Sequence, residues 1–353
     1  MISFMSRNGL RAVLALLAFP APLFSAAQRL PVQIVADSIN RSVIVTAGGI
    51  PFTTFWYPDT LEKPVLYPIY APDGEVITRG FPIKPRPGEP ADHPHHVGLW
   101  FNYENVNGLD FWNNSYAIPP ARKGQYGWIR TDSVSIRSGG PDDASISYAA
   151  RWTDQQDHTL LTERTHFRFS ATAHERIIDR VTRLTAQTDV QFPDAKDGML
   201  GLRVTRELQI PSNAPGEFID DKGNITSVPA GNAPDINGNY LTSAGRTGDS
   251  AWGTRGNWCM MYGKKGADTI SIVIIDHPSN PGYPTYWHAR GYGLLAANPF
   301  GWREFHNDPD KDGSWTIQQD KQLKFRYRVL IHPGDYQRAK VAQAYQEYAA
   351  HER

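Results

Sequence analysis

The fold is predicted by the stretch Ala144-Ser145-Ile146-Ser147-Tyr148-Ala149-Ala150-Arg151-Trp152 and by the run after it, Thr159-Leu160-Leu161-Thr162-Glu163-Arg164-Thr165-His166-Phe167-Arg168-Phe169. Aliphatic, aromatic and β-branched residues recur in both runs, and the polar turn Asp154-Gln155-Gln156-Asp157 separates them. Two shorter runs, Gly127–Arg130 and Val134–Arg137, precede them. Such close spacing is typical of an antiparallel meander, because a parallel crossover needs roughly a dozen residues or more.

Further strand-like segments flank this meander. They are Val32–Asp37, Ser42–Thr46, Pro51–Tyr57 and Lys63–Tyr70 before it, and Ile177–Thr182, Gly201–Val204, Asn257–Tyr262, Asp268–Asp276 and Lys324–His332 after it. The prolines of Lys63–Tyr70 favour an edge or wall position, because proline cannot donate a hydrogen bond to a neighbouring strand. Residues Pro211 to Asp249 are polar and weakly periodic, which indicates a long surface excursion of a kind that often carries function.

One helix is expected, at the C-terminal end. It runs from Tyr336 to about Ala350 with Asp335 as its N-cap, and one apolar stripe lies along it. The residues of that stripe are Val341, Ala344, Tyr345 and Tyr348. These patterns together predict a mainly β protein. We expect a large antiparallel β-sandwich with one C-terminal helix, in which residues 28–353 form a single domain.

The charge balance argues against a nucleic acid or an anionic membrane surface as partner. Among 353 residues, 36 Lys and Arg balance 36 Asp and Glu, so the formal net charge is zero. The chain is also rich in ring and turn residues, with 10 Trp, 16 Tyr, 30 Gly and 27 Pro, which suits a β-rich protein. The single cysteine, Cys259, can form no disulfide within the chain and is expected to be a buried small hydrophobe.

The N-terminal residues have the pattern of a targeting segment. Arg7 and Arg11 supply positive charge, Ala12 to Phe19 is a short apolar run, and Ser25-Ala26-Ala27 resembles a cleavage site. We therefore predict a signal peptide over residues 1–27 and export to the periplasm or the extracellular space. No later stretch approaches the roughly 20 apolar residues of a membrane-spanning helix, so the mature chain is expected not to span a membrane.

The densest group of chemically active side chains is Asp92-His93-Pro94-His95-His96-Val97-Gly98-Leu99-Trp100-Phe101-Asn102. If this segment is extended, His93 and His95 share one face and His96 takes the other. Two imidazoles on one face can bind a divalent metal together with a third ligand, can transfer protons near neutral pH, or can hydrogen-bond around an aromatic pocket. These alternatives stay open. His93 and His95 are the candidate metal ligands, and the candidates for a further ligand are His166, His277 and His288.

Asp110 and Glu163 are the carboxylates of most interest. Asp110 lies between two apolar residues, where partial burial would raise its pKa, although a turn role explains it equally well. Glu163 is expected to be a solvated strand residue. His93 or His95 is the candidate catalytic base, and Asp110 or His288 is the candidate proton donor.

Rings beside directional hydrogen-bonding groups are typical of a sugar pocket, because a sugar has apolar CH faces and polar hydroxyls. Such residues gather around the histidine stretch and again between Asp276 and Trp302, and we expect these two segments to form opposite walls of a pocket for a carbohydrate or small molecule. The candidate substrate-binding residues are Arg79, Trp100, Asn102, Trp112, His277, Asn280, Trp287, Arg290 and Asn298. No phosphate loop, Rossmann fingerprint or GxSxG elbow is present, so no nucleotide cofactor is expected.

Several segments resemble one family in order and content. They are Tyr67–Gly74, Thr78–Pro82, Asp92–Phe101, Val106–Trp112, Asp276–Pro281, Pro284–His288, Tyr292–Leu294 and Ala297–Gly301. Over nearly all of the mature chain, the sequence resembles the bacterial PmoA-family proteins, a domain of unknown function often labelled methane oxygenase. The resemblance implies an exported β-sandwich protein of polysaccharide-degrading bacteria. It also implies an architecture similar to the galactose-mutarotase-like supersandwich, where a concave sheet holds a sugar and His and carboxylate groups move protons.

Three functions are compatible with these features. The first is a carbohydrate-active enzyme, an isomerase, lyase or hydrolase, that acts on a sugar or an oxidised glycoside by acid–base chemistry. The second is a glycan-binding module that performs no chemistry. The third is a metal-dependent oxidase, which the histidine group and the family label favour.

Overall fold

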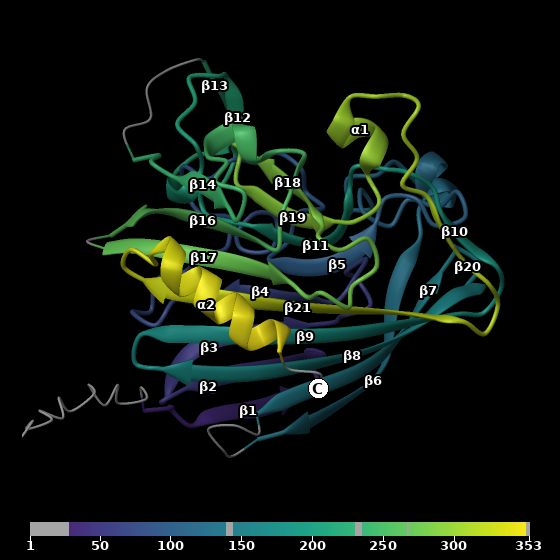
Figure 1. Cartoon of the computed structure of the whole chain (residues 1–353), viewed down its shortest axis with the longest axis horizontal. Helices are drawn as coiled ribbons and strands as arrows, with labels where there is room; N and C mark the ends of the chain where they lie inside the picture. Colours follow the sequence, from purple (N-terminus) through teal and green to yellow (C-terminus); the bar gives the residue numbers. More distant parts are fainter. Residues whose placement is uncertain (1–27, 139–143, 230–234, 267, 351–353) are drawn as a thin grey trace, which may run out of the picture.

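The computed structural model describes residues 28–138, 144–229, 235–266 and 268–350, so the predicted signal peptide over residues 1–27 lies outside the described residues. Two large antiparallel sheets form the body of the protein (Figure 1). One has nine strands in the order β1 (Val32–Asp37), β2 (Ser42–Ala47), β3 (Ile50–Trp56), β4 (Val65–Ile69), β5 (Leu99–Tyr103), β11 (Gly198–Arg203), β19 (Leu294–Asn298), β18 (Tyr286–Arg290) and β15 (Thr254–Arg255). The other has eight strands in the order β14 (Asn239–Thr242), β16 (Trp258–Lys265), β17 (Asp268–Asp276), β21 (Gln322–Pro333), β9 (Glu175–Ala186), β8 (Thr159–Thr172), β7 (Ser145–Thr153) and β6 (Trp128–Arg137).

Smaller elements extend from these sheets. Two short antiparallel pairs are β10 (Val190–Phe192) with β20 (Trp315–Ile317), and β12 (Gly216–Ile219) with β13 (Ile225–Val228). The α-helices are α1 (Trp302–His306) and α2 (Arg338–Ala349), and short 3-10 helices cover Pro120–Gln125, Arg206–Leu208 and Gly248–Ala251. Among the residues that the structure describes, no helix combines the length and the apolar character needed to cross a membrane.

The predicted mainly β fold, a large antiparallel sandwich, is confirmed. Apolar side chains alternate along the strands, so one face of each sheet supplies a shared core. Rings from the two sheets meet there: Phe55 of β3 lies 6.0 Å from Phe167 of β8, and Phe101 of β5 lies 5.4 Å from Phe325 of β21. Cys259 is fully buried in the same core, as expected.

The core also contains a buried ion pair. Arg180 Nη2 lies 2.8 Å from Glu163 Oε1, and Tyr148 and Trp152 each donate a hydrogen bond to the same carboxylate. The expectation that Glu163 is a solvated strand residue is therefore wrong, because its side chain points between the sheets. A buried carboxylate needs such partners, since an unpaired charge in the core would cost several kcal/mol.

Two local predictions are also wrong. Lys63–Tyr70 was expected at an edge or wall, but β4 pairs with both β3 and β5. The sheet accepts the strand because only Val65 and Leu66 pair with β5, and Pro68 lies beyond them. The helix α2 begins at Arg338, not at Tyr336, and its N-cap is Gln337 instead of Asp335.

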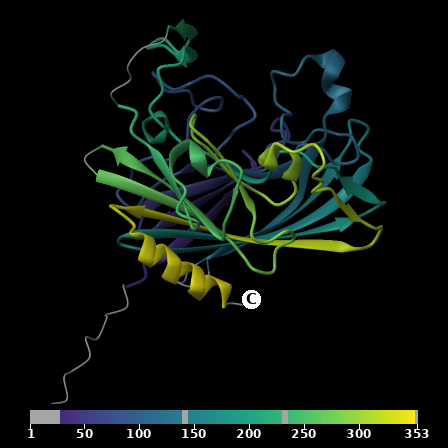
Figure 2. The same cartoon turned by 45° about the horizontal axis from the view of Figure 1, so that its top comes forward.

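The two outer faces of the sandwich are covered differently. Figure 2 shows α2 below the sandwich and the long loops above it. The predicted apolar stripe of α2, with Val341 and Tyr348, packs on the outer face of the eight-stranded sheet against Val273 and Leu330. The outer face of the nine-stranded sheet lies beneath the long loops, which include the predicted excursion from Pro211 to Asp249.

Candidate functional site

Four neighbouring strands carry one row of residues on the outer face of the nine-stranded sheet. Trp100 lies opposite Gly201, Gly201 opposite Ala296, and Ala296 opposite His288. A Cβ on Gly201 would meet Cζ2 of Trp100 at 2.5 Å and Cη2 of Trp112 at 2.8 Å. Only a glycine therefore leaves room for both indoles to lie across the middle of this face.

Roughly parallel rings form an offset stack above this row, and we call this stack the ring column. Tyr292 stacks on His93 at 4.8 Å between ring centroids, His93 on His96 at 4.8 Å, and His96 on Trp100 at 5.2 Å. His95 meets His96 edge to face at 4.3 Å. All three imidazoles thus gather in one place.

The expectation of an extended segment with His96 on the opposite face is wrong. Pro94 and His95 form a turn, His93 has a φ of 45°, and β5 begins only at Leu99. The backbone N–H of His96 donates to the carbonyl of His93 at 3.0 Å, which closes the turn. This closure brings together side chains that a strand would separate.

Arg79 holds this turn in place. Its guanidinium donates to the carbonyls of Asp92 at 2.6 Å, His93 at 2.9 Å and His96 at 3.2 Å, and its side chain is fully buried. We predicted that Arg79 binds substrate, but these contacts occupy the guanidinium inside the protein. Its role is to shape the histidine turn.

Asp92 is the carboxylate shared by two buried arginines. Its Oδ1 lies 2.7 Å from Arg79 Nη1 and 2.6 Å from Arg203 Nη2, while Oδ2 contacts Nδ1 of His93. Burial alone would raise the pKa of Asp92, but the His93 hydrogen bond and the charges of Arg203 and Arg79 hold it well below the usual range. Asp92 is therefore ionised at neutral pH, and it orients the His93 ring, which is 40% exposed.

The other two imidazoles are neutral, and they are less exposed than His93: His95 is half-buried and His96 is buried. Burial, the charge of Lys63 and then that of His93 lower the pKa of His95 well below its ordinary value. The pKa of His96 is lowered chiefly by burial, and Arg203 Nη1 lies 3.2 Å from its Nδ1, which fits an unprotonated acceptor there. His93 is consequently the most exposed member of the trio.

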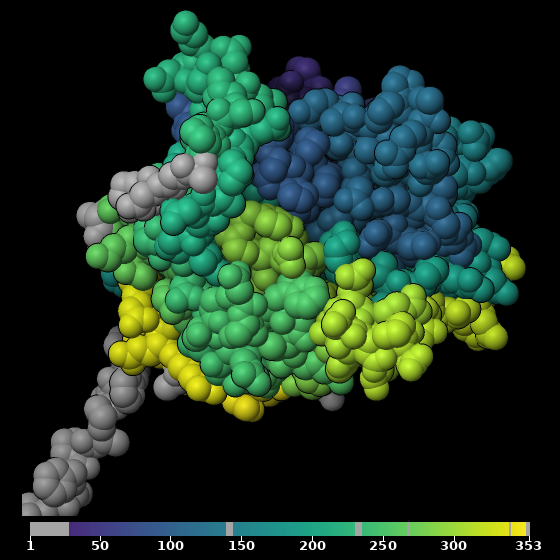
Figure 3. Space-filling model, turned by 90° about the horizontal axis from the view of Figure 1, so that it is seen from above, coloured from purple at the N-terminus to yellow at the C-terminus, as the bar shows by residue number. Residues whose placement is uncertain are grey.

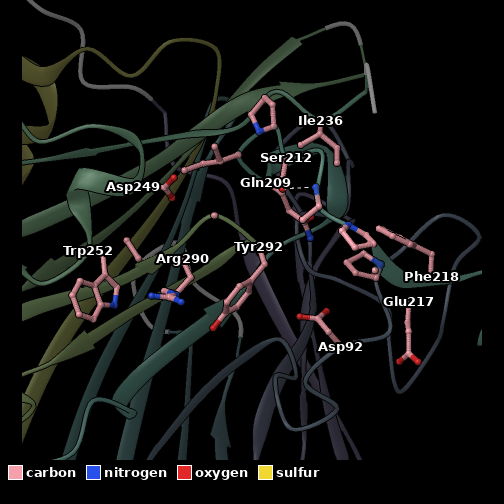
Figure 4. Close-up of a pocket in the computed structure, with 18 residues that line it drawn as sticks. Asp92, Gln209, Ser212, Glu217, Phe218, Ile236, Asp249, Trp252, Arg290 and Tyr292 are labelled. Atoms are coloured by element: carbon pink, nitrogen blue, oxygen red, sulfur yellow. Dashed lines mark hydrogen bonds between the residues drawn. The ribbon is translucent and has the colours of Figure 1, made fainter. Parts of the chain in front are cut away.

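A pocket of about 640 Å³ opens beside the ring column. In Figure 3 the blue loops and the green excursion surround a hollow floored by yellow-green residues. Figure 4 shows Trp252, Arg290 and Tyr292 along one side, Phe218 on the other, and Asp92 between them. Ser212 of the excursion and the neighbouring Gln209 add polar groups, so part of the excursion lines the pocket.

Arg290 has an exposed side chain in this pocket. Its guanidinium carbon lies 5.8 Å from the ring centroid of Trp252 and 6.0 Å from that of Tyr292. Within the described ranges no carboxylate forms an ion pair with it. That Arg290 contacts a ligand stays a prediction.

His288 and Asp110 belong to a second group of titratable residues on the same sheet face. His288 Nδ1 lies 3.2 Å from Asp197 Oδ1, and Lys196 Nζ lies 3.2 Å from Asp197 Oδ2. Burial opposes ionisation of Asp197, but His288 and Lys196 outweigh it and lower the pKa of Asp197 to about 2. Burial raises the pKa of Asp110, as predicted, although Asn113 opposes the shift.

Glu104 completes this group. Burial and then the charge of Asp197 raise the pKa of Glu104 to about 7. Glu104 and Asp110 line a separate hollow of about 300 Å³. Two carboxylates whose pKa values lie far apart, here Glu104 and Asp197, are a common arrangement for acid–base work.

The remaining predicted residues are not at this site. His277 and Asn280 lie near the eight-stranded sheet, where the His277 ring contacts Tyr348 of α2 and Asn280 hydrogen-bonds to the backbone of Arg326. Trp287 points into the sandwich core. The segment from Asp276 to Trp302 therefore contributes to the predicted pocket wall only through β18, β19 and Tyr292. Side chains alternate between the two faces of a strand, so every second one points into the sandwich core.

Asn102 and Asn298 lie on the correct strands but are fully buried. Asn102 Nδ2 donates to the carbonyl of Phe111 at 2.5 Å, and Asn298 Nδ2 donates to that of Ala195 at 2.8 Å. Their contacts hold the loops that surround the site. The prediction that Asn102 and Asn298 bind substrate directly is therefore wrong, because both amides are buried and bonded to the backbone.

Sequence reasoning missed Arg203, Tyr292, Asp197, Glu104 and Trp252. One signal for Arg203 was present, because an arginine within the otherwise apolar Gly198–Val204 is costly without a partner. Nothing comparable marked the others, since each gains its role from a neighbour that is distant in sequence.

Whether His93 and His95 bind a metal stays a prediction, and the described residues offer them no third ligand. Across the described parts of the chain, no three or more His, Cys, Asp or Glu side chains are arranged to hold a metal ion. His93 and His95 meet each other edge to face, with ring centroids 5.6 Å apart.

The sequence matches a family model over residues 42–346, which is most of its length. The chain belongs to the family of unknown function DUF6807. The resemblance to PmoA-family proteins is therefore wrong, because no PmoA family model matches. The methane oxygenase label came from that resemblance, so it no longer favours a metal-dependent oxidase. A comparison with curated proteins finds no match.

Solved structures match the chain at low identity. The galactosidase domain of the α-galactosidase–sucrose kinase AgaSK is 12% identical, with a TM-score of 0.37 over 85% of this chain and 42% of that chain. The α-galactosidase AgaB from Geobacillus stearothermophilus is 8% identical, with a TM-score of 0.37 over 86% of this chain and 41% of that chain. A galactose mutarotase-like protein from Clostridium acetobutylicum is 10% identical, with a TM-score of 0.41 over 86% of this chain and 99% of that chain.

The chain spans about two fifths of the length of these α-galactosidases. At such TM-scores the likeness carries no argument about activity. The functional proposal therefore rests on the pocket.

Proposed function

We propose that this protein binds a saccharide in the pocket of about 640 Å³ and acts on it by acid–base chemistry at His93. The observation that carries the proposal is the open wall in which Arg290 lies between the rings of Trp252 and Tyr292. Flat rings suit the CH faces of a sugar, and a guanidinium without a carboxylate partner suits its oxygens. The volume lies within the range of ordinary small-molecule sites, roughly 300–1,000 Å³.

The Asp92–His93 pair supplies the chemistry in this proposal. Asp92 holds Nδ1 of His93, so Nε2 is the nitrogen that remains to accept or donate a proton. Two contacts support this assignment: His93 stacks on Tyr292, which lines the pocket, and Asp92 lines the pocket itself. The chemistry assigned to His93 is proton transfer at a sugar carbon or oxygen, as in an isomerase, lyase or hydrolase.

A binding screen followed by product analysis tests the proposal. The probes are a panel of neutral and uronic mono- and oligosaccharides, with binding followed by tryptophan fluorescence and products by mass spectrometry. Trp252→Ala is expected to weaken binding about tenfold through lost ring contact. His93→Gln is expected to keep the affinity within about threefold and to lower turnover at least about 100-fold.

The chain offers a matched control for His93. His158 Nδ1 lies 2.9 Å from Asp154 Oδ2, so it forms a similar pair away from the pocket, and His158→Gln should leave turnover unchanged. Binding without any product would identify a non-catalytic glycan-binding module. If no saccharide binds, or if turnover survives in His93→Gln, the proposal is wrong.

We also propose export to the periplasm or the extracellular space, on the basis of the N-terminal charge pattern. Expression of the full chain in a bacterial host should yield a mature N-terminus near Gln28, measured by intact mass. A chain that keeps residues 1–27 in the cytoplasm would contradict export.

A further inference from the structure

A row of like charges crosses the outer face of the eight-stranded sheet. Arg164 of β8 lies directly opposite Arg183 of β9, and Arg183 lies directly opposite Lys324 of β21. Directly opposite residues have Cβ atoms about 5 Å apart, and like charges at this spacing are destabilising. Burial and the charges of Arg326 and Arg183 lower the pKa of Lys324, which agrees with that repulsion.

Ion pairs within the described part of the chain do not offset the charges of these three side chains. Among the described residues, no carboxylate forms an ion pair with Arg164, Arg183 or Lys324. Arg164 and Arg183 are exposed, so their charge faces solvent. A chain with a net charge of zero has therefore concentrated positive charge on one sheet face without a structural reason.

The same face is hollowed beside α2. Two adjoining hollows of about 320 and 560 Å³ share His166 and Val181, and we call them together the basic groove. Their described lining includes the arginines 164, 168, 183, 326 and 328. Within that described lining Asp179 is the sole carboxylate, and Arg328 binds it with two contacts of 2.6 and 2.8 Å. Figure 1 shows that β8 and β9 extend well beyond the end of α2.

We propose that the basic groove binds an anionic polysaccharide, whose carboxylate or sulfate groups pair with Arg164, Arg183 and Lys324. Guanidinium groups recognise both oxyanions through paired hydrogen bonds. The inference does not depend on the proposed pocket function, because the groove lies on the other sheet. It also revises the expectation from net charge, since a local field governs binding of a polyanion.

The lining favours a polysaccharide over a nucleic acid. Proteins that bind single-stranded nucleic acid stack bases on exposed aromatic rings. Apart from histidine, the rings in the described lining are those of Tyr148 and Tyr348, and both are buried. Ser133, Ser135 and Ser147 instead place hydroxyl groups beside the arginines, where they can hydrogen-bond to sugar hydroxyls.

A binding experiment on the full chain tests the proposal. The probes are polygalacturonate, dextran sulfate, neutral dextran and a single-stranded oligodeoxynucleotide, each at low and at high salt. The test variant is Arg164→Gln/Arg183→Gln. The control, Lys222→Gln/Lys311→Gln, removes the same charge from exposed positions outside the groove. The test variant is expected to bind at least one charged polysaccharide about tenfold more weakly than wild type, and the control less than about twofold more weakly.

Stability separates a binding role from a structural one. Because the test variant removes a repulsive pair, its Tm should equal or exceed that of the wild type. If the double variant does not fold, the single variants carry the test, each with an expected loss of about threefold. A preference between polygalacturonate and dextran sulfate tells which oxyanion the groove takes.

Any of the following results would overturn the inference. They are no binding to either charged polysaccharide, an equal loss in the control, and tighter binding of the oligodeoxynucleotide that disappears in the test variant. Binding of neutral dextran with the same affinity would also refute a role for the charge.

Discussion

Replacement of Asp92 by alanine should destabilise the whole histidine turn. The carboxylate is the shared partner of Arg79 and Arg203, whose side chains are both fully buried. Removing one partner of a buried ion pair costs about 3–5 kcal/mol, because the remaining charge is left without compensation. Asp92 itself is 31% exposed, so water can reach the vacated space. We therefore expect a loss at the lower end, about 3 kcal/mol.

Thermal and urea unfolding measure this loss. In a chain of this size 1 kcal/mol changes Tm by about 2 °C, so Asp92→Ala should lower Tm by about 6 °C. The control is Asp132→Ala, which removes the carboxylate bound by Arg151 at an exposed position and should cost less than about 1 kcal/mol. Equal effects of the two substitutions would refute the reasoning, because they would show that the buried arginines do not depend on Asp92.

The same residue predicts a pH dependence with a definite sign. The folded-state pKa of Asp92 lies well below that of the unfolded chain. Its stabilisation is therefore complete above about pH 4, and it is lost as the pH falls through the folded-state pKa. The difference in unfolding free energy between wild type and Asp92→Ala should shrink below about pH 4. A difference that stays constant on acidification would contradict the assigned ion pairs.

Two further predictions concern the same sheet face. Because burial and Asp197 raise the pKa of Glu104 to about 7, the folded state binds its proton more tightly, so stability should fall as the pH rises from about 4.5 to about 7. Glu104→Gln should flatten that fall by on the order of 1–3 kcal/mol in urea unfolding at several pH values, and an unchanged pH profile would argue against a buried Glu104. Gly201→Val should destabilise the protein by about 1–3 kcal/mol and shift its tryptophan fluorescence, because a Cβ there would lie 2.5 Å from Trp100. Gly124→Ala, with open space around the new Cβ, is the control, and equal melting temperatures for the two variants would rule out the overlap.

The local sequence predicted most of the strands. The runs at Val32, Ser42 and Thr159 begin at the observed first residues of β1, β2 and β8. This succeeds because alternation of apolar and polar residues is a local property of a strand with one buried face. Pro68 shows a limit of this local reasoning, because its presence led to the wrong prediction of an edge strand. Whether a strand is central or at an edge depends on which segments pair beside it, and the partners of β4 include a strand more than 30 residues away.

The sequence predicted several residues of the candidate site, but it did not predict how they are arranged. The composition of the stretch from Asp92 to Asn102 was enough to mark it as important. The stretch could not show that a turn, not a strand, brings its imidazoles together, because that turn is held by Arg79 and by Arg203 from β11. Its best partner ring, Tyr292, lies almost 200 residues further along the chain.

Sequence by itself thus determined that this protein is a large antiparallel β-sandwich with a His- and Trp-rich face. The pattern of each strand is encoded within a few residues, and the chemistry of a side chain is visible without coordinates. Only the tertiary structure decided which of those side chains share a site. It placed His277 on the opposite sheet, turned Trp287 into the core, and left the His93 ring 40% exposed beside Tyr292. The physical reason is that burial, pKa and contact depend on neighbours which strand pairing brings together from distant parts of the chain.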